Sequence, residues 1–156
     1  MMQFIKNQAG ANVSLQDLSD EIWIFDMIFT NCETVCLLMT ANIAKLQKMA
    51  QKEKVKVHFI SFSVDPLIDT PEKLKDYALQ YDADISNWDL LTGYSEEDIK
   101  RIAKSVKTLA EKPSGTNQVT HSTKFFLVNK DGVAVKGYDG VKPPFGEIIK
   151  DLKLLD

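Results

Sequence analysis

Cysteine is scarce in this 156-residue chain: Cys32 and Cys36 are its whole thiol content, beside two histidines, His58 and His121. A chain of this length buries roughly 70% of the surface of its unfolded state and needs no disulfide to fold. The two cysteines are therefore not required as a scaffold, which favours a chemical role. Two thiols do not define the redox compartment, because such a pair suits an oxidising exterior or a cytosolic redox or metal site.

Basic charge, long apolar runs and linkers are also missing. Lysine and arginine number 19 against 22 acidic residues, a net charge of −3, so there is no basic field for nucleic acid. No apolar run approaches the ~20 residues of a membrane-spanning helix, and residues 1–6 lack the apolar centre of a signal peptide. Without repeats or Gly/Ser/Pro-rich linkers, we expect one soluble domain over residues 1–156, either complete or cut from a longer precursor.

Strand and helix patterns alternate along the chain. The nearly continuous apolar run Ile22–Phe29 is typical of a strand buried on both faces, and residues 36–51 show helical spacing. Further on, the patterns predict a strand over Val55–Val64, a helix from Pro71 to about Tyr81 capped by Thr70, a short strand Trp88–Leu91, a helix from Ser95 to about Ala110, strands Phe125–Val128 and Val133–Val135 around the turn Asn129–Gly132, and a helix Phe145–Leu155.

The order of these elements predicts the fold class. Strands separated by helices imply parallel pairing, and the hairpin near the C-terminus adds antiparallel strands at one edge. Near the N-terminus, residues 4–15 predict a short hairpin with Gly10 in its turn. We therefore expect an α/β, thioredoxin-like fold with a central mixed sheet, flanking helices and an N-terminal hairpin.

Cys32 and Cys36 lie where the first core strand gives way to the first long helix. Side chains four residues apart share one face of a helix, and the positive end of the helix dipole favours a thiolate. Two such sulfurs can hold a soft metal ion or form a disulfide, which the Cα separation of ~6 Å in an ideal helix would strain. The alternative is a pair of buried core thiols with no chemistry.

The histidines differ in their surroundings. The loop before the strand Phe125–Val128 of a thioredoxin-like fold lies beside the turn that carries the cysteines, so His121 is a candidate partner of the two thiols. Two thiolates and one imidazole suit copper, whereas structural zinc needs four ligands. His58, within a strand, is more typical of a packed side chain, and Met39 of a core residue than of a thioether ligand.

Asp65 and Asp69 follow the second core strand, at the end of the sheet where Cys32 is expected. They either support the site by hydrogen bonds or serve only local structure. The local interpretation is favoured, because Asp65 and Pro66 suit a turn and Asp69 or Thr70 suits a helix cap.

Four segments in this order resemble the Sco/SenC family of copper-binding, thioredoxin-like assembly factors for cytochrome c oxidase. They span nearly the whole chain and are Phe29–Cys36, Ser61–Pro71, Trp88–Gly93 and His121–Gly132. One departure is clear: Glu33, Thr34, Leu37 and Leu38 stand where the family commonly has prolines in or just after the cysteine motif.

The resemblance implies that Cys32, Cys36 and His121 bind copper, as Cu(I) or Cu(II). It implies an assembly factor for the binuclear copper site of oxidase subunit II, which works with other copper chaperones or thiol reductants. It also implies a position on the extracytoplasmic face of a membrane, by an N-terminal helix or lipid anchor that this chain does not carry. A metallochaperone is favoured over an enzyme.

Two alternatives remain open. One is a thiol–disulfide oxidoreductase that reduces the cysteines of the oxidase copper site through a redox-active Cys32–Cys36 pair. The other is a copper- or redox-responsive signalling module. A peroxidase of the same fold is disfavoured, because Arg101 is the only arginine and the turn before Cys32 is not rich in threonine and proline.

Overall fold

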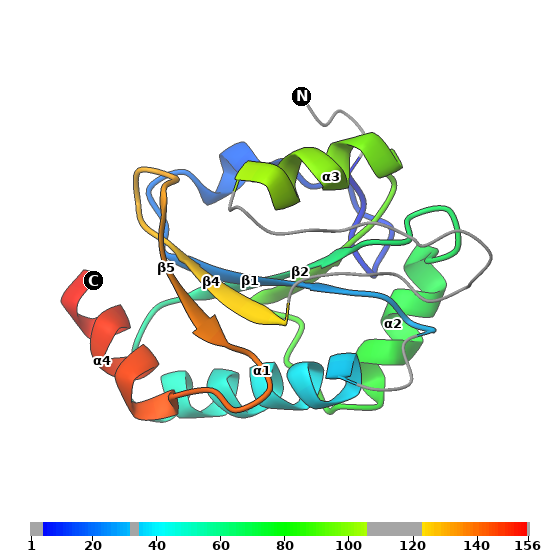
Figure 1. Cartoon of the computed structure of the whole chain (residues 1–156). Helices are drawn as coiled ribbons and strands as arrows, with labels where there is room; N and C mark the ends of the chain where they lie inside the picture. The colour runs from blue at the N-terminus through cyan, green and yellow to red at the C-terminus, as the bar shows by residue number, and fades with distance from the viewer. Residues whose placement is uncertain (1–4, 32–34, 106–122, 156) are drawn as a thin grey trace.

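A computed structural model describes residues 5–31, 35–105 and 123–155. Within these residues the elements follow one another as strands and helices in alternation (Figure 1). They are η1 (Leu15–Leu18), β1 (Trp23–Ile28), α1 (Val35–Lys52), β2 (His58–Ser63), α2 (Pro71–Leu79), β3 (Trp88–Leu91), α3 (Glu96–Ser105), β4 (Lys124–Val128), β5 (Ala134–Asp139) and α4 (Phe145–Leu155).

The strands form one mixed sheet in the order β3-β2-β1-β4-β5. Strand β1 pairs in parallel with β2, where Phe25 faces Ile60, and β2 pairs in parallel with β3. On its other side β1 pairs antiparallel with β4, where Phe25 faces Phe126, and β4 continues antiparallel into β5. The predicted mixed sheet, with parallel strands and an antiparallel hairpin at one edge, is confirmed.

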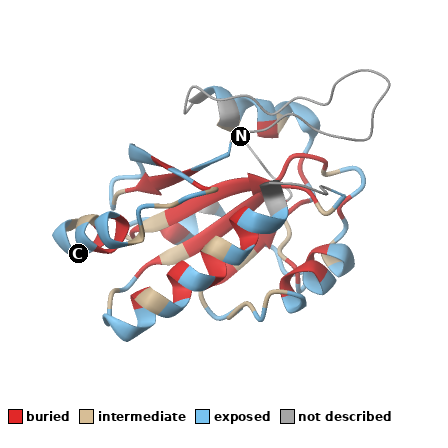
Figure 2. Cartoon of the chain, turned by 60° about the horizontal axis from the view of Figure 1, so that its bottom comes forward, coloured by how far each residue is buried: buried red, intermediate tan, exposed pale blue. Residues whose placement is uncertain are grey.

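Helices cover both faces of the sheet. Helices α1, α2 and α4 lie on one face, and α3 and η1 lie on the other (Figure 1). Alternation along β1 divides the core, because Ile24 and Ile28 pack toward α1 while Phe25 and Met27 pack toward α3. The strands are buried and the outer surfaces of the helices are exposed (Figure 2). This explains why β1 reads as a continuous apolar run.

The expected N-terminal hairpin is reduced to a single antiparallel bridge between Lys6 and Asn12. Gly10 adopts a φ of 77° in its turn, as the prediction requires. Lys6 also bridges Thr92, just beyond β3. The segment thus lies against the edge strand, and its backbone donors are shared between the turn and the sheet.

Strand β2 starts three residues later than the predicted Val55. Val55 N donates to Ala50 O and Lys54 N donates to Gln51 O, while Lys54 has a φ of 57°. This is the Schellman pattern that closes a helix at its C-terminus. Val55 therefore belongs to the end of α1, which satisfies helix carbonyls instead of pairing in the sheet.

Candidate metal centre

The cysteine motif begins where β1 leaves the sheet. Cys36 lies in the first turn of α1, while Cys32 and His121 fall outside the residues that the structure describes. The predicted ligand set of Cys32, Cys36 and His121 therefore stays a prediction. In the described part of the chain, no group of three or more histidine, cysteine, aspartate or glutamate side chains is arranged to hold a metal ion.

The residues on either side of the motif are well defined. Thr30, two residues before Cys32, donates to the Asp69 carboxylate from its hydroxyl at 2.5 Å and from its backbone N at 3.3 and 3.4 Å. Ser63 Oγ, at the end of β2, donates to Asp69 Oδ2 at 2.7 Å. Asp69 is 1% exposed, so this carboxylate joins two adjacent strand ends inside the protein.

Asp69 therefore supports the segment that carries the motif, and the local interpretation holds only for its neighbour. Thr70 is the N-cap of α2, and its side chain accepts from Lys73 N. Burial raises the pKa of Asp69, and the hydrogen bonds from Thr30 and Ser63 oppose that rise. The sequence had marked Asp69, but its contact with Thr30 joins residues 39 positions apart, which no local pattern reveals.

Tyr94 completes this cluster from the loop after β3, and sequence reasoning missed it. Its hydroxyl donates to the backbone O of Ser63 and to that of Leu91. Burial and the negative charge of Asp69 raise the pKa of Tyr94 well above its ordinary value. The tyrosine thus stays a neutral donor that fixes the carboxyl ends of β2 and β3.

Gly140 brings together the two segments that flank the predicted ligands. Its N–H donates to Thr123 O at 2.8 Å. A Cβ on Gly140 would lie 2.6 Å from Thr123 O and 3.1 Å from Met39 Cε, so both groups touch this glycine. Thr123 is two residues after His121, and Met39 is three residues after Cys36. Met39 is fully buried, which confirms its core role.

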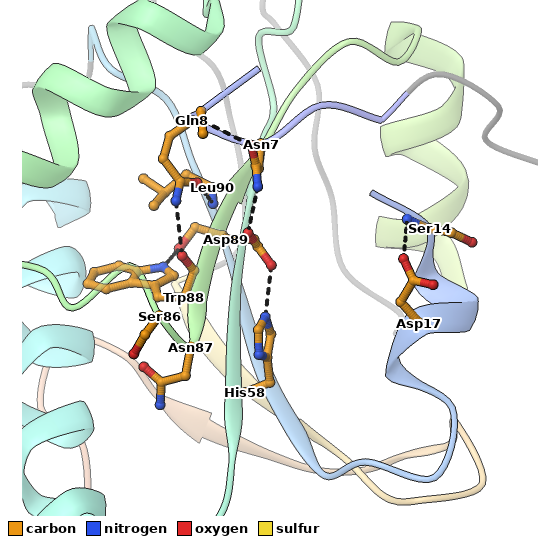
Figure 3. Close-up of polar contacts among 12 residues, drawn as sticks. Asn7, Gln8, Ser14, Asp17, His58, Ser86, Asn87, Trp88, Asp89 and Leu90 are labelled. Atoms are coloured by element: carbon orange, nitrogen blue, oxygen red, sulfur yellow. Dashed lines mark hydrogen bonds and ion pairs between the residues drawn. The ribbon is translucent and has the colours of Figure 1, made fainter. Parts of the chain in front are cut away.

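His58 is engaged elsewhere. Its Nε2 lies 2.9 Å from Asp89 Oδ2, and Asn7 Nδ2 donates to Asp89 Oδ1 at 3.0 Å (Figure 3). Burial acts to raise the pKa of Asp89, but the hydrogen bonds from His58 and Asn7 and the charge of His58 together lower it. His58 is therefore the packed, half-buried strand residue that the sequence predicted.

A cavity of about 380 Å³ lies at the end of the sheet where β1 and β2 begin, away from the motif. Its lining includes Ile22, His58 and Lys130. No helix in the described residues has the length and apolar character that crossing a membrane requires.

Comparison with known proteins gives consistent results. Residues 3–155 match the model of the SCO1/SenC family. The SCO1 protein homolog of Bacillus subtilis (strain 168) is 49% identical over 150 residues, which are 95% of this chain and 78% of that protein. A lipoprotein of the SCO1/SenC family from Bacillus anthracis str. Ames has a similar crystal structure, with a TM-score of 0.94, 46% identity and coverage of 99% of this chain and 93% of the other.

Two further structures extend the comparison. BsSco, described through its disulfide switch as a member of the Sco family of cytochrome c oxidase assembly proteins, superposes with a TM-score of 0.88 at 47% identity, covering 98% of this chain and 90% of its own. Arabidopsis thaliana ScoI, solved with copper bound, superposes with a TM-score of 0.81 and coverage of 99% and 98%. At 23% identity it shows the shared fold alone. From the family match over residues 3–155 and the identity to the Bacillus subtilis homolog, the chain belongs to the SCO1/SenC family.

Proposed function

We propose that this protein is a copper-binding assembly factor for cytochrome c oxidase, with Cys32, Cys36 and His121 as its copper ligands. Membership of the SCO1/SenC family supports the proposal, as do the relatives described with bound copper and as oxidase assembly proteins. Two thiolates and an imidazole form a donor set that suits both Cu(I) and Cu(II).

One structural observation carries the proposal: the contact of Met39 and Thr123 at Gly140. Met39 belongs to the helix that starts with the cysteine motif, and Thr123 belongs to the segment that contains His121. Strands β1 and β4 are also antiparallel neighbours, so the chain leaves β1 and enters β4 at the same end of the sheet. Two segments that are distant in sequence therefore approach each other from adjacent strands, which is what a shared metal site requires.

The client that we propose is the binuclear copper site of oxidase subunit II, and other copper chaperones or thiol reductants would supply copper or electrons. The lipoprotein relative from Bacillus anthracis supports a position on the extracytoplasmic face of a membrane. The proposed role is delivery of copper as cargo, so we infer a metallochaperone rather than an enzyme.

A titration of the reduced protein with Cu(I) and then with Cu(II), followed by visible absorption, tests the ligand set. We expect one equivalent of copper in the parent, and loss of stoichiometric binding in Cys32→Ala and Cys36→Ala. His121→Ala should lose the Cu(II) absorption, whereas the matched control His58→Ala should keep it. A His121→Ala protein with unchanged stoichiometry and absorption would contradict the proposal.

A thiol–disulfide oxidoreductase is the second candidate, favoured by the disulfide switch described for BsSco, which is 47% identical to this chain. In this reaction the two thiols of the pair give two electrons and two protons to a client disulfide and become a disulfide themselves. The reaction needs Cys32 and Cys36 but not His121. Exchange with an oxidised peptide of the oxidase copper site should survive His121→Ala and fail in either cysteine variant.

A further inference from the structure

The Asp69 carboxylate ties the segment that leads to the cysteine pair to the end of β2. Each carboxylate oxygen receives a hydroxyl donor: Thr30 Oγ1 at 2.5 Å on Oδ1 and Ser63 Oγ at 2.7 Å on Oδ2. The Thr30 backbone N donates to both oxygens. On the main chain, Thr92 Oγ1 donates to Asp69 O at 2.7 Å, which adds the end of β3. Residues after three neighbouring strands thus meet at one residue.

Local structure alone does not explain this carboxylate. The helix that follows is capped by Thr70, which accepts from Lys73 N, and Pro71 takes the first helical position. Asp69 N donates to Asp65 O in the turn before the helix, and this backbone bond would form with any residue except proline at position 69. The side chain of Asp69 points instead at the β1–α1 connection.

Nor does stability alone explain it. Asp69 is 1% exposed, and no lysine, arginine or histidine of the described residues forms an ion pair with it. Its donors are hydroxyl and amide groups, and the nearby Asp65 adds to the burial that raises its pKa. A buried acid without a cation is a weak source of stability. Its geometry is more informative, because every side-chain donor fixes a residue at the motif end of the sheet.

We propose that Asp69 is a positioning residue that holds the β1–α1 connection in the geometry in which the Cys32 and Cys36 thiols act together. This inference rests on the proposed function of the pair. Fixing both the amide and the hydroxyl of Thr30 sets the direction in which the chain reaches Cys32, two residues later. Ligands held in advance lose less conformational entropy when they bind an ion, and residues that orient metal ligands affect affinity without touching the metal.

Asp69→Asn tests the inference, because asparagine keeps the size of the side chain but removes its charge and one acceptor oxygen. Thr70→Ala is the matched control: it damages the adjacent helix cap and leaves the Thr30 contacts intact. Cu(I) affinity is measured by competition with a chromophoric chelator, beside the midpoint of urea unfolding. We expect Asp69→Asn to weaken Cu(I) binding by about 10- to 100-fold. Thr70→Ala should lower the unfolding midpoint with Cu(I) affinity within about twofold of the parent.

Thr30→Val is a milder second variant, since it removes only the hydroxyl and keeps the backbone donor. It should weaken Cu(I) binding in the same direction, and the double variant with Asp69→Asn should bind no more weakly than Asp69→Asn alone. If both variants kept parental Cu(I) affinity, or if Thr70→Ala lowered it equally, the inference would be wrong.

The redox equilibrium of the pair gives a readout that does not depend on copper. Oxidation by glutathione disulfide converts the two thiols into one intrachain disulfide and releases two glutathione molecules. Asp69→Asn should change the equilibrium constant of this exchange, and Thr70→Ala should not. Failure of the parent to bind Cu(I) would overturn the proposed ligand function. The glutathione equilibrium would then decide on Asp69 separately, and an unchanged constant there would overturn this inference.

Discussion

The hydroxyl of Ser61 donates a hydrogen bond to Asp26 Oδ1 at 2.6 Å, across the parallel pair β1 and β2 in the middle of the sheet. Trp88 Nε1 donates to the same Ser61 oxygen at 3.1 Å, so the serine proton is directed at the carboxyl group. Asp26 is fully buried, and its Oδ2 has no hydrogen-bond partner within the part of the chain that the structure describes. Burial raises the pKa of Asp26 to about 7, although the Ser61 hydrogen bond opposes the rise.

This pKa predicts that Asp26 makes stability depend on pH. Its folded-state pKa of about 7 exceeds its ordinary value of 3.8, so its contribution is full below 3.8 and is lost as the pH rises through 7. The loss amounts to about 4 kcal/mol, since each pKa unit corresponds to about 1.4 kcal/mol. Urea unfolding between pH 4 and pH 8 should therefore show Asp26→Asn gaining stability relative to the parent as the pH rises.

Asp84→Asn is the control for this profile, because the shift of Asp84 has the opposite sign. Hydrogen bonds from the Ser86 hydroxyl and amide lower the pKa of Asp84. Its contribution is present above the ordinary value and is lost as the pH falls, so Asp84→Asn should lose stability relative to the parent toward high pH. Parallel curves for the Asp26→Asn variant and the parent would contradict the assignment of Asp26 as a buried, protonated acid.

The close approach at Gly140 predicts a large effect of a single methyl group. A Cβ there would meet Thr123 O at 2.6 Å and Phe125 Cε1 at 3.0 Å, neither of which is the end of a flexible side chain. Gly140→Ala should therefore lower the free energy of unfolding by about 2 kcal/mol. Gly146, in α4, has no atom within 4 Å of such a Cβ, so Gly146→Ala should raise stability by roughly 0.5–1 kcal/mol. Urea denaturation checks both, and equal effects would contradict the predicted clash.

Local signals predicted the elements that are complete in themselves. The apolar run Trp88–Leu91 and the amphipathic segment Phe145–Leu155 match β3 and α4 at both ends. The predicted strand from Val55 was too long, because Val55 closes α1 by a hydrogen bond to Ala50. Periodicity cannot distinguish a residue that ends a helix from one that begins a strand, since both are apolar and buried or half-buried.

The site shows the same division. The cysteine pair is recognisable from spacing alone, and Thr70 and Pro71 gave a sufficient local reason for the acids beside them. That sufficiency concealed the role of Asp69, whose carboxylate contacts Thr30 across 39 positions of sequence. The contact depends on β1 and β2 ending side by side, and this follows from the sheet register rather than from any short segment.

A buried hydroxyl pair joins the first two helices and should affect stability without affecting the thiols. Thr40 Oγ1 in α1 and Tyr77 Oη in α2 lie 2.8 Å apart. Tyr77→Phe leaves the Thr40 hydroxyl without this partner, which should lower the free energy of unfolding by about 1–2 kcal/mol. The double variant with Thr40→Val should lose less than the sum of the two single changes, because both remove one interaction. Additive losses in urea unfolding would contradict a direct hydrogen bond.

The contact between His58 and Asp89 predicts how the two histidines differ in function. His58→Asn shortens the side chain and removes the 2.9 Å contact with Asp89, which also receives Asn7 Nδ2. Because His58 and Asp89 are each about one-fifth exposed, the loss should be about 1 kcal/mol, below the 1.5–3 kcal/mol of a fully buried charged hydrogen bond. Faster proteolysis near residues 5–12 should accompany it, since Asn7 holds that segment to the sheet through Asp89. Copper stoichiometry should stay at the parental value, because the network lies where β2 begins and the cysteine motif lies where β1 ends. A His58→Asn protein that lost copper while keeping its unfolding midpoint would assign the imidazole ligand to the wrong histidine.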